Sequence, residues 1–175
     1  MRTIGIATAV SLAFGSLVTA QERPGAEIGT SLGVTILSGG GESVTHFGIP
    51  GTGIFGQPTM YVTIPSGPLL LEPQIAFNIF SSDGETATTV GLGGQVGYAF
   101  QGAAVNSAYI AGSGAFQSLS GGGDSESDFG AGAALGYRIM LGTSGVMRVE
   151  GRFRRWFDSE LNEFALALGF AVRLK

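Results

Sequence analysis

The end of the chain alternates strictly between apolar and small residues. From Phe164 to Leu174 every second residue is large and apolar, while the residues between them are mostly alanine and glycine, with Glu163 and Arg173 at the two ends. A period of two is typical of a β-strand, because successive side chains point to opposite faces. One face of this strand is therefore continuously apolar, and the other face is small.

The same alternation recurs upstream and predicts eight strands in an up-and-down series. Segments rich in Gly, Pro or polar residues separate them, and residues 42–58 are expected to be the longest irregular connection, with a short strand extension around 44–49. Pro73 has no backbone donor, so its strand needs a bulge or an unpaired position there. The expected strands are 26–37, 59–64, 69–80, 87–100, 107–119, 128–141, 146–157 and 164–174.

The connections are expected to differ between the two ends of the strands. Pro65–Pro68, residues 101–106 and Gly142–Gly145 are short, as periplasmic turns are. The connections at 42–58 and 121–127 are long or rich in Gly and acidic residues, which is typical of outward-facing loops.

Composition indicates where such strands would lie. Only 13% of the 175 residues are charged, 44% are hydrophobic and 31 are glycine. Soluble domains carry about 25% charged residues. After the N-terminus no segment supplies the roughly 20 apolar residues of a membrane-spanning helix. Low charge without such a helix favours an all-β fold, an eight-stranded antiparallel transmembrane β-barrel.

The N-terminus predicts a secretory signal peptide. Arg2 provides the positive start, Ile4–Val18 the apolar core, and Val18-Thr19-Ala20 the small residues before a cleavage site. We therefore expect residues 1–20 to be removed and residues 21–175 to form the barrel domain, exported to the bacterial outer membrane.

Alternation alone does not say which face points outward, so a soluble, lipocalin-like carrier with an apolar pocket is the alternative fold. The face opposite the apolar one carries small residues and most of the charges, which would pair with one another inside a barrel. Eight strands enclose a lumen that side chains alone can fill. The sequence therefore predicts a plugged interior. Its expected polar network comprises Glu72, Gln74, Gln95, Arg138, Arg148, Glu150, Arg152 and Arg173.

Aromatic residues are expected to form two belts at the membrane interfaces. The loop-side belt would contain Phe80, Phe116, Phe129, Phe157 and Phe164, and the turn-side belt Tyr98, Phe100, Tyr109 and Tyr137. Arg155 and Trp156, near the outer end of a strand, are candidates for contact with a lipid headgroup phosphate, and interfacial anchoring is the simpler interpretation.

No motif predicts catalysis, a cofactor or a metal site. His46 is the single histidine, and its neighbours Glu42 and Ser43 form no recognisable nucleophile–base set. Asp124–Asp128 lacks the ligand spacing of a calcium loop. Cysteine is absent, and the net charge of −4 argues against nucleic acid.

The mature chain, about residues 25–175, resembles the small OmpA/OmpX-type outer-membrane β-barrel family in its signal peptide, its eight alternating segments and its terminal strand Phe164–Leu174. The resemblance implies contact with outer-membrane lipid and lipopolysaccharide, insertion by the barrel-insertion machinery, and a monomer. Such barrels usually end in an aromatic residue, and here the nearest one is Phe170. Family members are envelope structural proteins, adhesins or lipid-modifying enzymes.

The leading hypothesis is a non-enzymatic integral outer-membrane barrel with a structural or surface-interaction role. A lipid-modifying enzyme, a small-solute channel and the soluble carrier are the alternatives. Lipid A acylation by a His46→Ala variant would distinguish the enzyme, and conductance across a planar bilayer would distinguish the channel.

Overall fold

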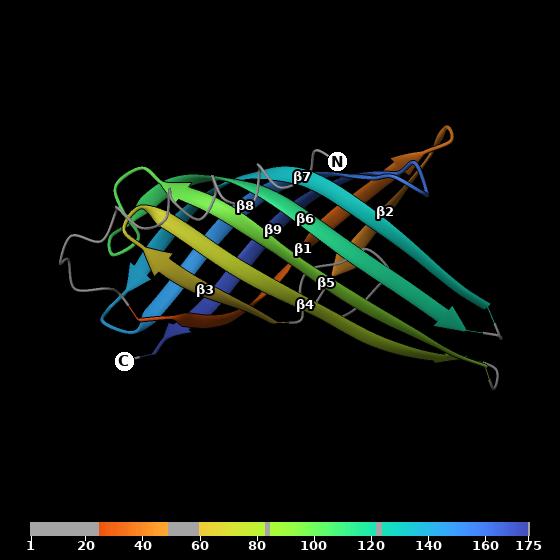
Figure 1. Ribbon diagram of the computed structural model, residues 1–175, viewed down its shortest axis with the longest axis horizontal. Helices are drawn as coiled ribbons and strands as arrows, with labels where there is room; N and C mark the ends of the chain where they lie inside the picture. Colours follow the sequence, from red (N-terminus) through yellow and green to blue (C-terminus); the bar gives the residue numbers. More distant parts are fainter. Residues whose placement is uncertain (1–24, 49–59, 83–84, 122–123, 175) are drawn as a thin grey trace, which may run out of the picture.

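The computed structural model describes residues 25–48, 60–82, 85–121 and 124–174, without the side chains of 46–48, 78, 80–82, 85–86 and 124. The predicted signal peptide lies outside this part of the chain. The described residues form strands joined by turns (Figure 1). Within these ranges, no helix is long and apolar enough to cross a membrane. The strands are β1 (Glu27–Gly39), β2 (Glu42–Gly48), β3 (Met60–Ser66), β4 (Leu69–Ser82), β5 (Glu85–Ala99), β6 (Ser107–Gly121), β7 (Asp124–Leu141), β8 (Gly145–Trp156) and β9 (Asn162–Arg173).

The sheet closes into a barrel because β1 pairs with β9 from Glu27–Arg173 to Ser38–Asn162. Every neighbouring pair of strands is antiparallel. β2 and β3 occupy a single barrel position, since β2 pairs with β1 at Gly33–Gly39 and β3 pairs with β1 at Glu27–Gly29. The chain is therefore an all-β, eight-stranded antiparallel barrel, as its alternation predicts.

The short strand extension expected around 44–49 is confirmed as β2, and residues 124–127, expected to be irregular, are also a strand. Residues 42–48 pair with β1 in a hairpin, and residues 124–127 extend β7 against Ser118–Gly121 of β6. Pairing gives the backbone amides and carbonyls of these polar segments hydrogen-bond partners, which outweighs their weak strand propensity. The outward connection after β1 is thus only Gly40 and Gly41.

Pro73 is paired with Gly94 of β5 but unpaired on its β3 side, and neither ladder contains a bulge. The ladder between β3 and β4 keeps one register from Met60–Ile75 to Ser66–Leu69 but skips Val62 and Thr63, which lie opposite the proline region. Of the two solutions expected for Pro73, the unpaired position is the one the structure uses.

The short turns lie together at one end of the barrel, which we call the turn end. They connect β3 to β4 at Gly67–Pro68, β5 to β6 across residues 100–106, and β7 to β8 at Gly142–Ser144. Gly67 and Gly142 have φ angles of 60° and 67°, which side chains other than glycine adopt at a cost. The opposite end, where β1, β4, β6 and β8 finish, is called the loop end.

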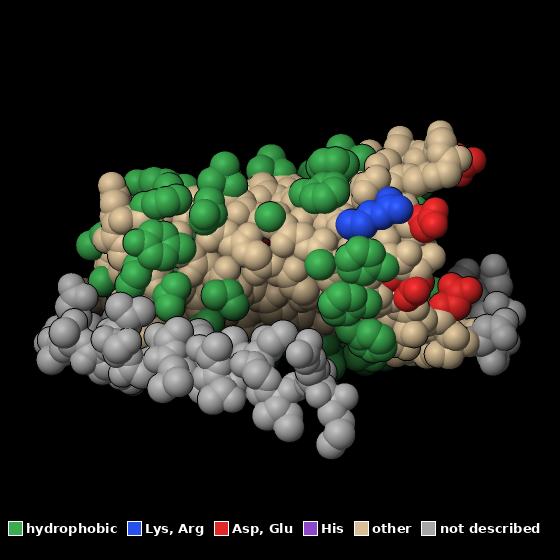
Figure 2. All heavy atoms as spheres, turned by 45° about the horizontal axis from the view of Figure 1, so that its top comes forward, with side chains coloured by type: hydrophobic (Ala, Val, Ile, Leu, Met, Phe, Trp, Pro, Cys, Tyr) green, Lys and Arg blue, Asp and Glu red, His purple; other side chains and the backbone are tan. Residues whose placement is uncertain are grey.

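The apolar face points outward. Phe164 and Leu166 are 51% and 61% exposed, whereas Glu150 is 1% exposed. Figure 2 shows hydrophobic side chains over the cylinder wall, with acidic and basic side chains gathered at one end. A soluble carrier would need the reverse arrangement, so the lipocalin-like alternative is wrong.

Among the described side chains the aromatic belts follow the prediction with one correction, and the side chain of Phe80 lies outside the described part. Phe129 stacks on Phe157 with ring centroids 5.9 Å apart near the loop end, and Tyr98 meets Phe100 edge-on at 5.7 Å near the turn end. Tyr109, expected in the turn-side belt, is instead buried in the lumen. Its hydroxyl donates a hydrogen bond to Glu150, which makes the interior a better site for this ring than the lipid face.

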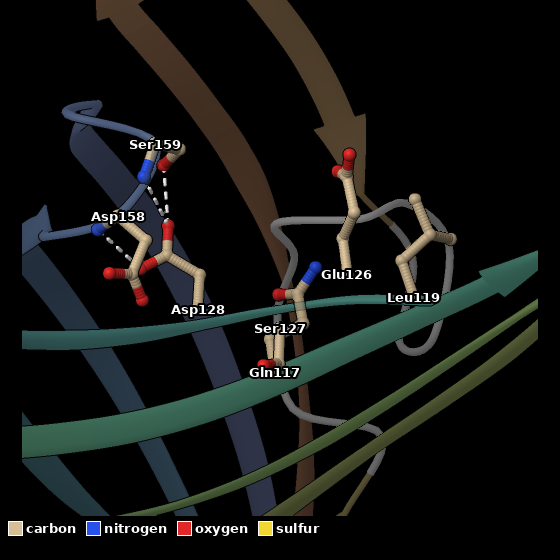
Figure 3. Close-up of a pocket in the computed structure, with 7 residues that line it drawn as sticks. All are labelled: Gln117, Leu119, Glu126, Ser127, Asp128, Asp158 and Ser159. Carbon is tan, nitrogen blue, oxygen red and sulfur yellow. Dashed lines mark hydrogen bonds between the residues drawn. The ribbon is translucent and has the colours of Figure 1, made fainter. Parts of the chain in front are cut away.

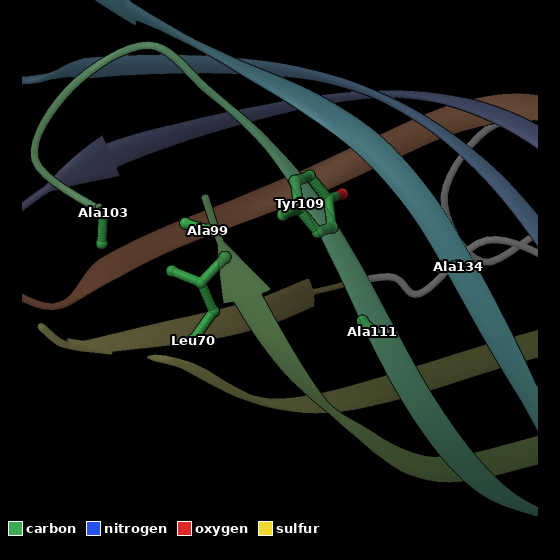
Figure 4. Packing of buried hydrophobic residues seen from close by; sticks show 6 residues of the cluster. All are labelled: Leu70, Ala99, Ala103, Tyr109, Ala111 and Ala134. Carbon is green, nitrogen blue, oxygen red and sulfur yellow. The ribbon is translucent and has the colours of Figure 1, made fainter. Parts of the chain in front are cut away.

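Small residues on the inner wall make room for large side chains in the lumen. A Cβ added to Gly136 would lie 2.5 Å from the Tyr109 ring, and one added to Gly130 would lie 3.0 Å from Trp156. At the turn end, Tyr109 belongs to an apolar cluster (Figure 4) that also includes Leu70, Ala99, Ala103, Ala111 and Ala134. The glycines of the inner parity are thus spaces for specific neighbours.

Candidate functional site: a charged lumen and an acidic mouth

Three groups of charged side chains follow one another along the lumen. The turn-end cluster is Glu27, Arg138 and Arg173. The central cluster is Glu72, Arg148 and Glu150 with their neutral partners. The loop-end cluster is Glu163, Arg152, Arg154 and Trp156.

The turn-end cluster joins the first and last strands through one carboxylate. Arg138 donates from Nη2 to both oxygens of Glu27 at 2.8 Å, and Arg173 donates to Glu27 Oε1 at 2.9 Å. Arg173 also reaches the carbonyl oxygen of Ala103 at 3.4 Å, in the connection between β5 and β6. This cluster therefore ties the closing seam of the barrel to the turn end.

The central cluster is the most highly connected part of the lumen. Glu72 accepts hydrogen bonds from Arg148, from Thr63 Oγ1 at 2.7 Å and from Gln74 Nε2 at 2.8 Å. Gln95 Nε2 bridges Glu72 at 3.1 Å and Glu150 at 3.2 Å. Since hydrogen bonds to charged groups are worth about 1.5–3 kcal/mol each, loss of Glu72 would be costly.

Two tyrosines complete the central cluster. Tyr109 donates to Glu150 Oε2 at 2.6 Å, and the guanidinium of Arg148 lies 3.9 Å from the centroid of the Tyr61 ring. Cation–π stacking of this kind is strongest where water is excluded, as it is around both buried side chains.

The loop-end cluster places two arginines around one carboxylate. Glu163 lies 3.2 Å from Arg152 Nη2 and 3.5 Å from Arg154 Nη1, and it accepts a hydrogen bond from Trp156 Nε1 at 2.9 Å. Among the described lumen residues the four glutamates thus face five arginines, and each glutamate has at least one arginine within 4 Å.

The eight residues of the expected polar network all point into the lumen, and the structure distributes them over all three clusters. Sequence reasoning left Glu27, Tyr61, Tyr109 and Glu163 out of the network. Glu27 and Glu163 lie on the inner parity of their strands, so parity alone could have found them.

Arg155 and Trp156, paired as lipid-contact candidates, lie on opposite sides of the wall. Trp156 is 2% exposed and hydrogen-bonded to Glu163 inside the barrel, so the hypothesis of a lipid contact at Trp156 is wrong. Consecutive strand residues point to opposite faces, so only one of the two can face lipid, and that residue is Arg155. Arg155 is partly exposed and donates to the Glu160 carbonyl at 2.6 Å and to Asn162 Oδ1 at 3.2 Å.

An acidic mouth lies at the loop end. A cavity of about 450 Å³ is bordered there by β6, β7 and the connection between β8 and β9 (Figure 3). Its lining residues are Gln117, Leu119, Glu126, Ser127, Asp128, Asp158 and Ser159.

Asp128 fastens the β8–β9 connection over this mouth. Its carboxylate accepts hydrogen bonds from the amides of Asp158 at 3.0 Å and Ser159 at 3.1 Å, and from the Ser159 hydroxyl. Partial burial acts to raise the pKa of Asp128, but these hydrogen bonds, led by that of Ser159, lower the pKa below its usual value.

The described side chains offer no metal site. The described side chains include no group of three or more His, Asp or Glu placed to hold a metal ion. His46 lies in β2 opposite Thr35, and its side chain is outside the described part of the structure.

An apolar outer wall around a lumen of paired charges defines an integral membrane β-barrel of eight strands. No family model matches the chain, and no curated protein matches it in sequence. Solved structures are similar in fold, and they are small outer-membrane barrels. The crystal structure of Neisserial surface protein A (NspA) aligns with a TM-score of 0.62 and 12% identity over 88% of this chain and 100% of that one. Ail of Yersinia pestis, in complex with the heparin analogue sucrose octasulfate, aligns with a TM-score of 0.54 and 11% identity over 87% and 99%. The chain therefore has the fold of the small OmpA/OmpX-type outer-membrane β-barrels.

Proposed function

We propose that the protein is a non-enzymatic outer-membrane barrel whose lumen is closed by its three charged clusters and whose acidic loop end faces the cell exterior for surface interaction. The supporting observation is the filling of the lumen: each of its described glutamates lies within 4 Å of an arginine, and buried aromatic rings pack beside these pairs. A lumen filled in this way holds the wall together and leaves no continuous water path.

The proposal is tested by fractionation and by conductance. The protein should appear in the outer-membrane fraction and migrate faster on a gel before boiling than after it, because the folded barrel resists detergent. The purified barrel in a planar lipid bilayer should give no steady current. Steady open-channel currents would show that the lumen conducts, and recovery from the soluble fraction would overturn the location.

We propose that a phosphorylated outer-membrane lipid is a partner of the outer wall. Arg155 is the only described basic residue that faces outward, and its side chain is fixed by Glu160 and Asn162. One row closer to the membrane centre, the wall has an apolar groove of about 830 Å³. Outward residues that line it are Val34, Ile36, Ala133, Leu135, Phe153, Phe164 and Leu166.

An acyl chain fits this groove and a phosphate fits the guanidinium above it. Native mass spectrometry of the barrel with lipid A should show retained lipid, and an Arg155→Gln variant should retain several-fold less. The matched control is Arg173→Gln, whose arginine faces the lumen. Equal retention by wild-type protein and the Arg155 variant would show that this lipid contact is non-specific.

A further inference from the structure

The acidic mouth contains a polar side chain that the barrel does not use. Gln117 lies on the inner parity of β6 and is 8% exposed, yet the described residues provide no hydrogen-bond partner for its amide. Its side chain extends into the space bordered by Glu126 and Asp128 (Figure 3). The amide atoms of Gln117 are open to the cavity, where a ligand or ordered water can bond to them.

The charged side chains around the mouth indicate whether that ligand is a cation or an anion. Outside the loop-end cluster, the described side chains at the loop end include five acidic residues and one basic residue, Arg155, which points to the outer wall. The acidic residues are Glu42, Glu126, Asp128, Asp158 and Glu160. The loop-end cluster lies on the lumen side of the cavity, and there Arg152 and Arg154 share Glu163. The mouth therefore attracts a cation.

The two exposed carboxylates at the mouth have different surroundings from Asp128. Asp128 is occupied by three hydrogen bonds from the β8–β9 connection, whereas Glu126 and Asp158 have exposed side chains on opposite sides of the cavity. Leu119 contributes an apolar surface beside Glu126, on the side away from Asp158 (Figure 3). These features suit a flexible cation with a hydrocarbon spacer between separated charges.

A bare metal ion fits the cavity poorly. Divalent ions need several oxygens at about 2.0–2.6 Å, and the described carboxylates form no such group. A volume of about 450 Å³ falls within the range of small-molecule sites, which is roughly 300–1,000 Å³.

We propose that the mouth binds a linear organic polycation of the polyamine type, with ammonium groups at Glu126 and Asp158 and the Gln117 amide oxygen as a buried acceptor. Binding to the purified barrel does not depend on the cellular location, so a failure here leaves the proposed outer-membrane function intact.

The test is isothermal titration of spermidine into the folded barrel in a zwitterionic detergent at fixed ionic strength. Wild-type protein should bind with one-site stoichiometry. Glu126→Gln should weaken binding about tenfold, and Gln117→Leu by several-fold, since each removes one hydrogen-bond acceptor. The matched control is Glu42→Gln, which removes an exposed carboxylate from the β1–β2 hairpin, away from the cavity. Heat-modifiable migration checks that every variant is folded.

Three results would overturn the proposal. Equal loss in Glu42→Gln and Glu126→Gln would show that spermidine responds only to overall charge. Unchanged affinity in Gln117→Leu would remove the buried acceptor from the site. Displacement of spermidine by Mg²⁺ at equal charge concentration would show an unselective acidic surface.

Discussion

Carboxylate side chains have different surroundings in the lumen and at the mouth. In the lumen Glu72 is nearly inaccessible and accepts four hydrogen bonds, including one from Arg148. At the mouth Glu126 is exposed, with no described hydrogen bond. A buried carboxylate needs a hydrogen-bonding or ionic partner within the fold, whereas an exposed carboxylate is solvated by water and can bind a ligand.

This contrast separates structure from recognition. The barrel excludes solvent along the height of its apolar belt, so the charged side chains at that height form ion pairs with one another. Beyond the belt, at the level of Asp128, a carboxylate can accept hydrogen bonds from a connection, as Asp128 does, or stay free to bind a ligand. The following predictions test this separation, in order of decreasing effect.

The largest effect is expected from breaking the central cluster. Glu72→Gln leaves the Arg148 guanidinium without the carboxylate that it contacts. Removing one member of a buried pair costs about 3–5 kcal/mol of the free energy of unfolding. Urea unfolding in lipid vesicles measures the loss.

The matching double variant, Glu72→Gln with Arg148→Met, removes both charges. It should recover a large part of the loss, because no unpaired charge then stays buried. If the double variant is as unstable as the sum of the single ones, the two residues are not coupled, and the lumen is held together by packing alone.

The next effect concerns the outer wall. Leu166→Arg places a charge on the lipid face of β9, and arginine near the middle of a bilayer costs about 2–4 kcal/mol in a barrel. Val44→Arg is the control, since Val44 is equally exposed but lies in the β1–β2 hairpin at the loop end. Equal tolerance of both arginines in vesicle unfolding would contradict the assignment of the wall to lipid.

A smaller effect is expected where a glycine makes room for a lumen side chain. Gly136→Ala should displace the Tyr109 ring and its hydrogen bond to Glu150, at a cost of about 1–3 kcal/mol. Gly112→Ala is the control, because a Cβ there meets nothing within 4 Å. Unfolding free energies that differ by less than the experimental error would show that the lumen can repack around the extra methyl group.

Sequence alternation predicted most of the fold, because the period of two is fixed by backbone geometry. It placed Glu150 and Arg148 in the lumen and Leu166 on the wall. In a regular strand the alternation fixes the face of every side chain, and only a bulge can change it. The register of the closing pair, Glu27 with Arg173, could not be read from the sequence, because it depends on the shear of the whole barrel.

The remaining errors come from residues that suit both environments. Tyr109 and Trp156 carry a polar atom on an apolar ring, so they fit an interfacial belt as well as a lumen with an acceptor. Their positions depend on acceptors from other strands, Glu150 and Glu163, which sequence distance does not reveal. Gln117 was not singled out at all, since one amide on a small-residue face carries no motif.

The smallest expected effect is a pH titration that distinguishes Asp128, which is hydrogen-bonded to the β8–β9 connection, from Glu126, which is not. The hydrogen bonds that lower the Asp128 pKa favour its charged form, so they stabilise the β8–β9 connection above the ordinary aspartate pKa. This contribution is lost as the pH falls through the lowered pKa of the folded protein. The amide proton signals of Asp158 and Ser159 should therefore shift together in an NMR titration, with a midpoint below that of an unperturbed aspartate.

Ser159→Ala removes the donor that contributes most to this lowering, so the Asp158 amide should then titrate at a higher pH. Glu126→Gln should leave the midpoint unchanged, because Glu126 makes no described hydrogen bond to the connection. A midpoint that follows Glu126 and not Ser159 would mean that the acids of the mouth titrate as one group. In that case the Asp128 carboxylate would not be bound specifically to the β8–β9 connection. The distinction between hydrogen-bonded and free carboxylates would then not apply at the mouth.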